Sequence, residues 1–157
     1  MNLFFWSVGS KHESYVKEGI EEFTKRINRY YSCKWQIVPP PKNAANLSVD
    51  DQKNQESRHL ISQFTNTDFV VLLDERGKML SSPQLGQLIE KQAGNSIKSL
   101  HFIIGGAFGV NDELRQRANF TWQLSQLVFP HQLVRLMLSE QIYRACSINN
   151  NEKYHHI

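Results

Sequence analysis

The chain has 157 residues, of which 40% are hydrophobic and 21% are charged. This length suits one domain that buries roughly 70% of its unfolded surface, and the balance of residues excludes disordered and fibrous proteins. A net charge of +3 permits a polyanionic partner without requiring one.

The chain begins with a strand pattern and a helix pattern in succession. Leu3–Val8 is a short, continuous apolar run of the kind that forms a buried strand. Apolar residues then recur at steps of three and four positions, with Glu and Lys between them, which predicts an amphipathic helix. These apolar positions are Val16, Ile20, Phe23, Ile27 and Tyr30.

A second strand and a second helix are predicted next. Trp35–Val38 has the pattern of a strand, and Pro39–Pro41 ends it because proline supplies no donor to a strand ladder. Lys42–Leu47 is predicted as a surface loop. Ser48, with Asp51 three positions later, marks the start of a helix that runs to about residue 64.

The middle of the chain repeats this alternation. Phe69–Asp74 is the clearest candidate for a buried parallel strand, and the charged residues after it are typical of a solvated turn. Ser81–Pro83 favours the start of a helix, because serine caps free amides and proline suits the first turn. The buried face of this helix is predicted at Leu85, Leu88 and Ile89.

The final third contains two strands and two helices by the same criteria. Leu100–Ile104 and Phe120–Leu124 are predicted strands, and Asn111 caps a short helix between them that ends near Ala118. A long apolar helix runs from Gln132 to about Ile148, so it lies centrally or in a subunit interface. The alternation predicts a single α/β domain over residues 1–157, with a mainly parallel sheet flanked by helices.

Cysteine usage and apolar runs indicate the compartment. Cys33 and Cys146 lie far apart and outside any CxxC motif, which favours a reduced, cytoplasmic protein. No apolar run approaches the length of a membrane span.

A glycine-rich turn follows the strand that ends at Ile104. Glycines at 105, 106 and 109 let a ligand approach the backbone closely, and the carboxyl edge of a parallel sheet is where ligands bind. Leu73 ends the neighbouring strand and is predicted to line the same pocket. The pattern is neither a dinucleotide fingerprint nor a Walker motif, so a plain tight turn explains it equally well.

The apolar segment Leu124–Phe129 has two interpretations, either core or the wall of a pocket for an aromatic ring. His131 follows it, and a helix cap is the simplest role for a histidine at that position. In the helix, Glu140 and Arg144 are spaced for an ion pair, whereas an unpaired Arg135 near a pocket would hold phosphate.

The tail at residues 149–157 is polar, which favours a frayed terminus. Its Tyr154, His155 and His156 could instead stack on a nucleobase, and they make a poor metal site without carboxylates or thiolates nearby. The chain shows no nucleophile motif and no paired carboxylates, so it offers no sign of covalent or metal catalysis.

The ordered set of these motifs resembles the ribosomal RNA large subunit methyltransferase H family, a small branch of the SPOUT methyltransferases. The resemblance covers essentially the whole chain. It is carried by Val8-Gly9, Leu73-Asp74 with Gly77-Lys78, Ile104–Gly106 with Gly109, Phe129–Arg135, Glu140–Ala145 and Tyr154-His155. The tail departs from the family pattern at residues 149–153 and at His156.

The resemblance implies a homodimer with a C-terminal trefoil knot that binds S-adenosylmethionine and needs no metal. The implied activity is methylation of N3 of a pseudouridine in 23S ribosomal RNA, on assembled ribosomes. Two alternatives remain: a non-catalytic ribosome-binding or assembly module, and a related knotted methyltransferase that acts on another RNA site.

The resemblance also implies roles for individual residues. The cofactor contacts fall on Leu73, Gly105, Leu124, Ser125, Gln126, Leu127, Val128 and Phe129. The catalytic positions are His131, Arg144, Tyr154 and His155, and the RNA-binding positions are Arg135, Arg144, Tyr154 and His155. His131 is a candidate base because imidazole titrates near neutral pH, and Arg144 could stabilise the deprotonated base.

Overall fold

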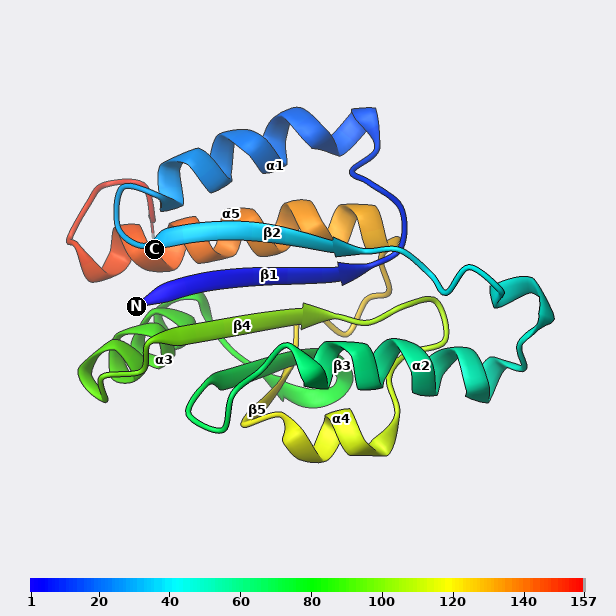
Figure 1. The fold of residues 1–157 in the computed structure, drawn as a ribbon. Helices are drawn as coiled ribbons and strands as arrows, with labels where there is room; N and C mark the ends of the chain where they lie inside the picture. The colour runs from blue at the N-terminus through cyan, green and yellow to red at the C-terminus, as the bar shows by residue number, and fades with distance from the viewer. Residues whose placement is uncertain (157) are drawn as a thin grey trace.

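The computed structural model describes residues 1–156, which form one five-stranded sheet with helices on both faces (Figure 1). The strands are β1 (Asn2–Val8), β2 (Ser32–Val38), β3 (Phe69–Met79), β4 (Ser99–Ile104) and β5 (Phe120–Gln123). The helices are α1 (Ser14–Ile27), α2 (Val49–Ser62), α3 (Ser82–Gly94), α4 (Asp112–Arg117) and α5 (His131–Asn149), with a 3-10 turn at Ala44–Asn46.

The sheet has the strand order β2-β1-β4-β3-β5, and every neighbouring pair is parallel. This confirms the predicted α/β domain with a parallel sheet. Because all strands run the same way, the ends of β4 and β5 lie at one edge of the sheet, next to Leu73 in the middle of β3, which pairs with Ile104 and Trp122. That edge positions the candidate site.

The two faces of the sheet are covered by different helices. One core contains Phe5 and Phe102 from the strands and Ile142 from α5, and residues of α1 and α3 join it. The other core contains Leu72 and packs against Leu60 of α2 and residues of α4. Within residues 1–156, no helix is both long and apolar enough to cross a membrane.

Three predicted helix starts are confirmed in atomic detail. The Ser48 hydroxyl accepts from the Asp51 amide at the start of α2, and Asn111 Oδ1 accepts from the Leu114 amide at the start of α4. Ser81 and Gln84 form a reciprocal capping box at the start of α3. Each side chain satisfies an amide that the first helical turn leaves without a partner.

The predicted turn after Asp74 is wrong, because β3 continues through the charged segment to Met79. Its pairing with β5 shifts register between Leu73 and Lys78. Gly77 allows this close pairing, since a Cβ there would lie 2.5 Å from the backbone of Thr121. In this protein, the dense charge pattern that is typical of a turn lies in the irregular second half of β3.

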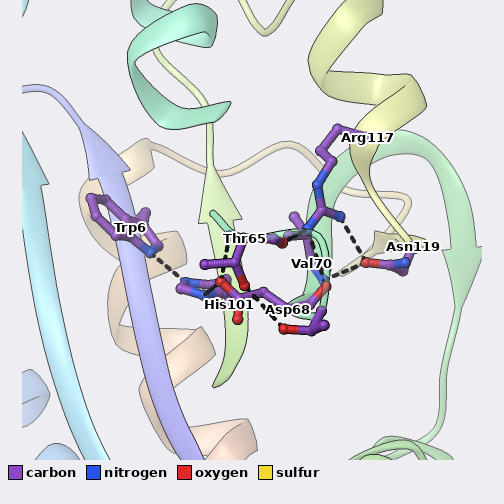
Figure 2. Close-up of polar contacts among 8 residues, drawn as sticks. Trp6, Thr65, Asp68, Val70, His101, Arg117 and Asn119 are labelled. Atoms are coloured by element: carbon purple, nitrogen blue, oxygen red, sulfur yellow. Dashed lines mark hydrogen bonds and ion pairs between the residues drawn. The ribbon is translucent and has the colours of Figure 1, made fainter. Parts of the chain in front are cut away.

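A buried polar network fixes the α2 side of the sheet, away from the glycine turn (Figure 2). Trp6 Nε1 donates to His101 Nδ1 at 3.0 Å, so the ring proton lies on Nε2, 3.2 Å from Asp68 Oδ2. Arg117 Nη2 donates to the carbonyls of Thr65 and Asp68. The network ties the loop before β3 to β1 and β4.

We expect the free energy of unfolding to depend on the neutral form of His101. Burial lowers the pKa of His101 below its ordinary value of 6.5, with Asp68 opposing that shift. The unfolded chain therefore binds a proton that the folded chain resists, and stability falls as the pH drops below that ordinary value. The His101→Phe variant keeps the stacking on Phe4 but leaves Trp6 and Asp68 without their partner.

Chemical denaturation at several pH values tests this expectation. His101→Phe should lose about 2 kcal/mol at neutral pH, since the lost bonds include one to a carboxylate. Its stability should also fall less steeply than that of the wild type between neutral pH and mildly acidic pH, while His12 and His131 retain their own contributions. Replacement of the exposed His59 by Asn is the control. An unchanged pH profile in His101→Phe contradicts the role given to this histidine.

Candidate functional site

A cavity opens at the carboxyl edge of β3, β4 and β5, beside the start of α5. Residues 73–75 of β3, the ends of β4 and β5 and the start of α5 build it, which is the arrangement expected for ligand binding in open parallel sheets. Its walls are Leu73, Asp74, Glu75, Ile104, Gly105, Gly106, Gly109, Val110, Gln123, Leu124, Ser125, Leu127, Val128, Phe129, His131 and Val134.

The structure brings together most of the residues expected to contact a cofactor. The residues that line the cavity are Leu73, Gly105, Leu124, Ser125, Leu127, Val128 and Phe129. Gln126 is the one member of that group outside the lining. His131, expected to act in catalysis, lies in the same wall.

The glycine turn presents backbone to the cavity because side chains do not fit there. A Cβ on Gly105 would lie 2.8 Å from Val110 Cγ1, closer than real contacts allow. The Gly109 amide donates to the Gly106 carbonyl at 3.0 Å, and Gly109 has a φ of +79° that favours glycine. The turn therefore contributes backbone without side chains at positions 105, 106 and 109 to the cavity wall.

The opposite wall is the segment 124–129, which combines apolar side chains with backbone donors. Leu127 is 71% exposed and Val128 is 92% exposed at the mouth of the cavity. The Leu127 amide donates to Ser125 Oγ at 3.0 Å. Among the protein groups of residues 1–156, the amides of Val128 and Phe129 find no acceptor, so they can serve a polar ligand edge.

Two acidic residues in the lining were not predicted as site residues. Asp74 is held by Arg115 at 3.3 Å and accepts from the Arg76 amide, whereas Glu75 is exposed at the cavity. Both come just after Leu73, where the apolar run of the sequence ends, and this position was the available signal in the sequence. Because the same charges are typical of a solvated turn, neither residue was predicted to line a site.

The structure contradicts the helix-capping role considered for His131. Pro130 is the N-cap of α5, His131 is the first helical residue, and no side chain caps this end. Partial desolvation of the imidazole, and then the nearby Arg135 cation, lower the pKa of His131 below its ordinary value, although the residue as a whole is exposed. The imidazole is therefore neutral at neutral pH and free to accept a proton.

Arg135 lies beneath the surface rather than on it. Its side chain is 1% exposed, its Nε donates to Ser7 Oγ at 2.9 Å, and its Nη1 lies 3.3 Å from His12 Nδ1. It reaches the lining of a second cavity on the other side of the glycine turn. Gly106 and His131 belong to the walls of both cavities.

The remaining predicted residues gather at the far end of α5. The predicted ion pair is confirmed, with Arg144 Nε donating to Glu140 Oε1 at 2.9 Å. The Arg144 guanidinium also lies over the Tyr154 ring, 4.7 Å from its centre, and His155 Nδ1 lies 3.3 Å from Arg144 Nη1. The expectation of a frayed tail is wrong as far as Tyr154, whose hydroxyl donates to Glu140.

One chain does not bring His131 together with the other three predicted catalytic residues, Arg144, Tyr154 and His155. Arg144 lies about 20 Å from His131 along the axis of α5, at a rise of about 1.5 Å per residue. Neither Arg144 nor Tyr154 belongs to the walls of either cavity near His131. In the part of the chain that the structure describes, no group of three or more His, Cys, Asp and Glu residues could hold a metal ion.

Comparison with known proteins gives full-length matches. The family described as "Predicted SPOUT methyltransferase" matches residues 1–155. Proteins named ribosomal RNA large subunit methyltransferase H from Cytophaga hutchinsonii and Clostridioides difficile are 40% and 41% identical to this chain over 156 and 160 residues. Each match covers 99% of this chain and 100% or 99% of the relative.

A solved structure is also similar at a lower level. The SpoU methyltransferase AviRb from Streptomyces viridochromogenes, in complex with AdoMet, matches with a TM-score of 0.41 and 12% identity. The match covers 96% of this chain and 61% of that chain.

The contacts of Glu140 predict how the tail is held. Glu140 accepts from both Arg144 and Tyr154, so Glu140→Ala should release the tail and leave Arg144 without its carboxylate. Amide hydrogen exchange in residues 150–156 should become about tenfold faster or more, in line with the loss of bonds to a charged group. Glu22→Ala removes a comparable i,i+4 carboxylate from Arg26 on α1 and is the control. Unchanged tail exchange in Glu140→Ala would show that other contacts hold the tail.

Proposed function

The chain belongs to the SPOUT methyltransferase family, among the ribosomal RNA large subunit methyltransferases H, and from this premise we propose the reaction that it catalyses. It transfers a methyl group from S-adenosylmethionine to N3 of a pseudouridine in 23S ribosomal RNA. The observation that carries this proposal is the full-length match, at 40% sequence identity, to a methyltransferase of that name.

The lining of the first cavity supports S-adenosylmethionine as the co-substrate. When bound, S-adenosylmethionine supplies a methyl group activated by its sulfonium, and the electrons of the broken carbon–sulfur bond stay on sulfur. Gly105 offers bare backbone against which an adenine ring can lie, and Leu73 and Phe129 supply apolar contact. The amides of Val128 and Phe129 are placed to donate to polar atoms of the ring.

The acceptor N3 carries a proton that must leave before or during methyl transfer. His131 is the group we assign to that proton, because its imidazole is neutral and lies in the wall shared by the two cavities. Arg144 then stabilises the negative charge that spreads over the imide oxygens of the base. The residues otherwise serve to align donor and acceptor, which explains why the sequence lacks a nucleophile motif.

A homodimer would allow His131 and Arg144 to act on the same base, although they lie about 20 Å apart within one chain. If α5 packs against its copy in the opposite direction, Arg144, Tyr154 and His155 of one protomer approach His131 of the other. This proposed dimer doubles the modest net charge of each chain, which is +3. Recognition would then depend on the shape of the assembled ribosome more than on charge, and an enzyme with that substrate would work in the cytoplasm.

We propose a trefoil knot for the C-terminal part of the chain. Residues 124–130 cross the same edge of the sheet as the turn 105–109, and α5 then packs between α1 and α3 instead of beside β5 (Figure 1). This return path is unusual, because chains generally avoid threading through their own loops. A knot would hold both walls of the first cavity at a fixed separation.

The direct test is single-turnover transfer of a radiolabelled methyl group from S-adenosylmethionine to ribosomes from a strain that lacks the enzyme. We expect label on N3 of one pseudouridine by mass mapping, and weak or no labelling of protein-free RNA. Calorimetry should also show heat of S-adenosylmethionine binding. No binding and no transfer would favour the ribosome-binding module, whereas label on another atom would indicate the related knotted methyltransferase.

A mixing experiment tests the composite dimer. His131→Ala alone and Arg144→Ala alone should each slow single-turnover transfer by about a hundredfold or more. If the two variants are unfolded together and refolded as a one-to-one mixture, half of the dimers pair one of each and contain one intact site. Activity should therefore return to about a quarter of the wild-type value. Recovery absent from the mixture, with dimers present by sedimentation, would place both residues in the same protomer's site.

A further inference from the structure

The second cavity contains two buried charged side chains that do not pair with each other. Its lining includes Arg135, which is 1% exposed, and Glu56 of α2, which is 4% exposed. Within residues 1–156, neither forms an ion pair with any group. Buried charges are normally paired, because removal from water costs several kcal/mol.

Glu56 has unused capacity to accept hydrogen bonds. Its Oε2 accepts from Gln52 Nε2 at 3.3 Å, a long contact, and its Oε1 is buried without any partner. A carboxylate offers about four acceptor positions, so this group is far from satisfied. Burial raises the pKa of Glu56, with Gln52 opposing the shift, as expected for a carboxylate that lacks donors.

Arg135 has complementary unused capacity to donate. Its Nε and Nη1 contact Ser7 and His12, while its Nη2 lies beside Gly9, 3.3 Å from where a Cβ would stand. Gly9 has a φ of +143°, a backbone conformation that side chains rarely adopt, and the guanidinium lies beside it. The cavity therefore offers a donor on one wall and an acceptor on another.

This cavity touches the first cavity through the glycine turn. Gly106 and His131 belong to both walls. The Glu56 carboxylate packs against Gly106, because a Cβ there would lie 2.6 Å from Glu56 Oε1. A ring in the second cavity would therefore lie next to the methyl donor and next to His131.

We propose that the second cavity is the subsite for the acceptor nucleobase, and that Glu56 accepts the N1–H group by which pseudouridine differs from uridine. Arg135 donates to the adjacent O2 carbonyl, and N3 faces the shared wall at Gly106 and His131. In uridine, N1 is bonded to the sugar and has no hydrogen, so Glu56 would remain without a donor. This inference rests on the proposed function and adds the residue that selects pseudouridine.

The test compares two kinds of ribosome, one with pseudouridine at the target position and one with uridine there. Both come from strains that lack this enzyme, and the strain for the uridine ribosomes also lacks the pseudouridine synthase. In single-turnover methyl transfer, the wild type should favour pseudouridine by about tenfold or more, because one hydrogen bond to a buried charge is at stake. Glu56→Met keeps the side-chain length without an acceptor and should reduce that ratio to about one, by slowing transfer to pseudouridine.

Matched variants separate recognition from folding. Glu56→Gln retains one carbonyl acceptor and should give an intermediate ratio, whereas Asp51→Asn removes an exposed carboxylate one turn earlier on α2 and should keep the wild-type ratio. Calorimetric binding of S-adenosylmethionine should be close to wild type in all three variants. The melting temperature should be no lower than that of the wild type, and Glu56→Met should raise it if the unpaired carboxylate is destabilising.

The outcomes are distinct. A Glu56→Met enzyme that still prefers pseudouridine as strongly as the wild type overturns the proposal, and so does a wild type that methylates both ribosomes equally fast. A wild type that binds S-adenosylmethionine but methylates neither ribosome refutes the proposed function, and the assignment of Glu56 falls with it.

Discussion

Close packing around three glycines shapes both cavities of this protein. Val110 lies against Gly105, Glu56 against Gly106 and Arg135 against Gly9, so that a Cβ at any of these positions would be crowded. The carboxyl edge of the sheet consequently carries no side chain at these three positions, and the neighbouring side chains pack directly on the backbone there. Because Gly106 belongs to the walls of both cavities, displacement of this turn would alter the shape of both cavities together.

Helix α5 has different chemistry at its two ends. Its first turn carries His131 and the buried Arg135 beside the cavities, whereas its last turns carry the Glu140–Arg144 pair and the packed tail. The buried residues between them pack against α1 and α3, so the helix is held as a rigid rod. A helix of this length keeps the two ends about 20 Å apart within one chain, so the proposed reaction, which uses groups from both ends, requires the proposed dimer.

Much of the fold follows from local sequence patterns. Strand and helix periodicities located every major element, and Ser48, Ser81 and Asn111 marked helix starts because capping depends on residues three positions apart. The extension of β3 past Asp74 could not be predicted in this way. It depends on the close approach of Gly77 to Thr121, which are distant in the sequence, and the local charge pattern favours a turn.

In the candidate site, too, local sequence patterns predicted some of the residues and missed others. Leu73 and Gly105 stand at the ends of apolar runs, so sequence reasoning could place them at the edge of the sheet. Glu56 carried no such signal, because a glutamate in a polar helix is normally exposed and only the packing of α2 on the glycine turn buries it. Local pattern thus locates the backbone of a site, while long-range packing decides which charges it buries.

The charged side chains near the two ends of α5 are paired at one end and unpaired at the other. We relate the paired charges to stability and the unpaired charges to ligand recognition. At the far end, Glu140 and Arg144 satisfy each other, and the tail adds a hydroxyl and an aromatic face to the pair. Near the cavities, Glu56 and Arg135 are more deeply buried and stay apart. A fold selected only for stability would pair these charges or replace them with apolar residues, since an unpaired buried charge is destabilising. Their separation across one cavity is best explained by a ligand that satisfies both.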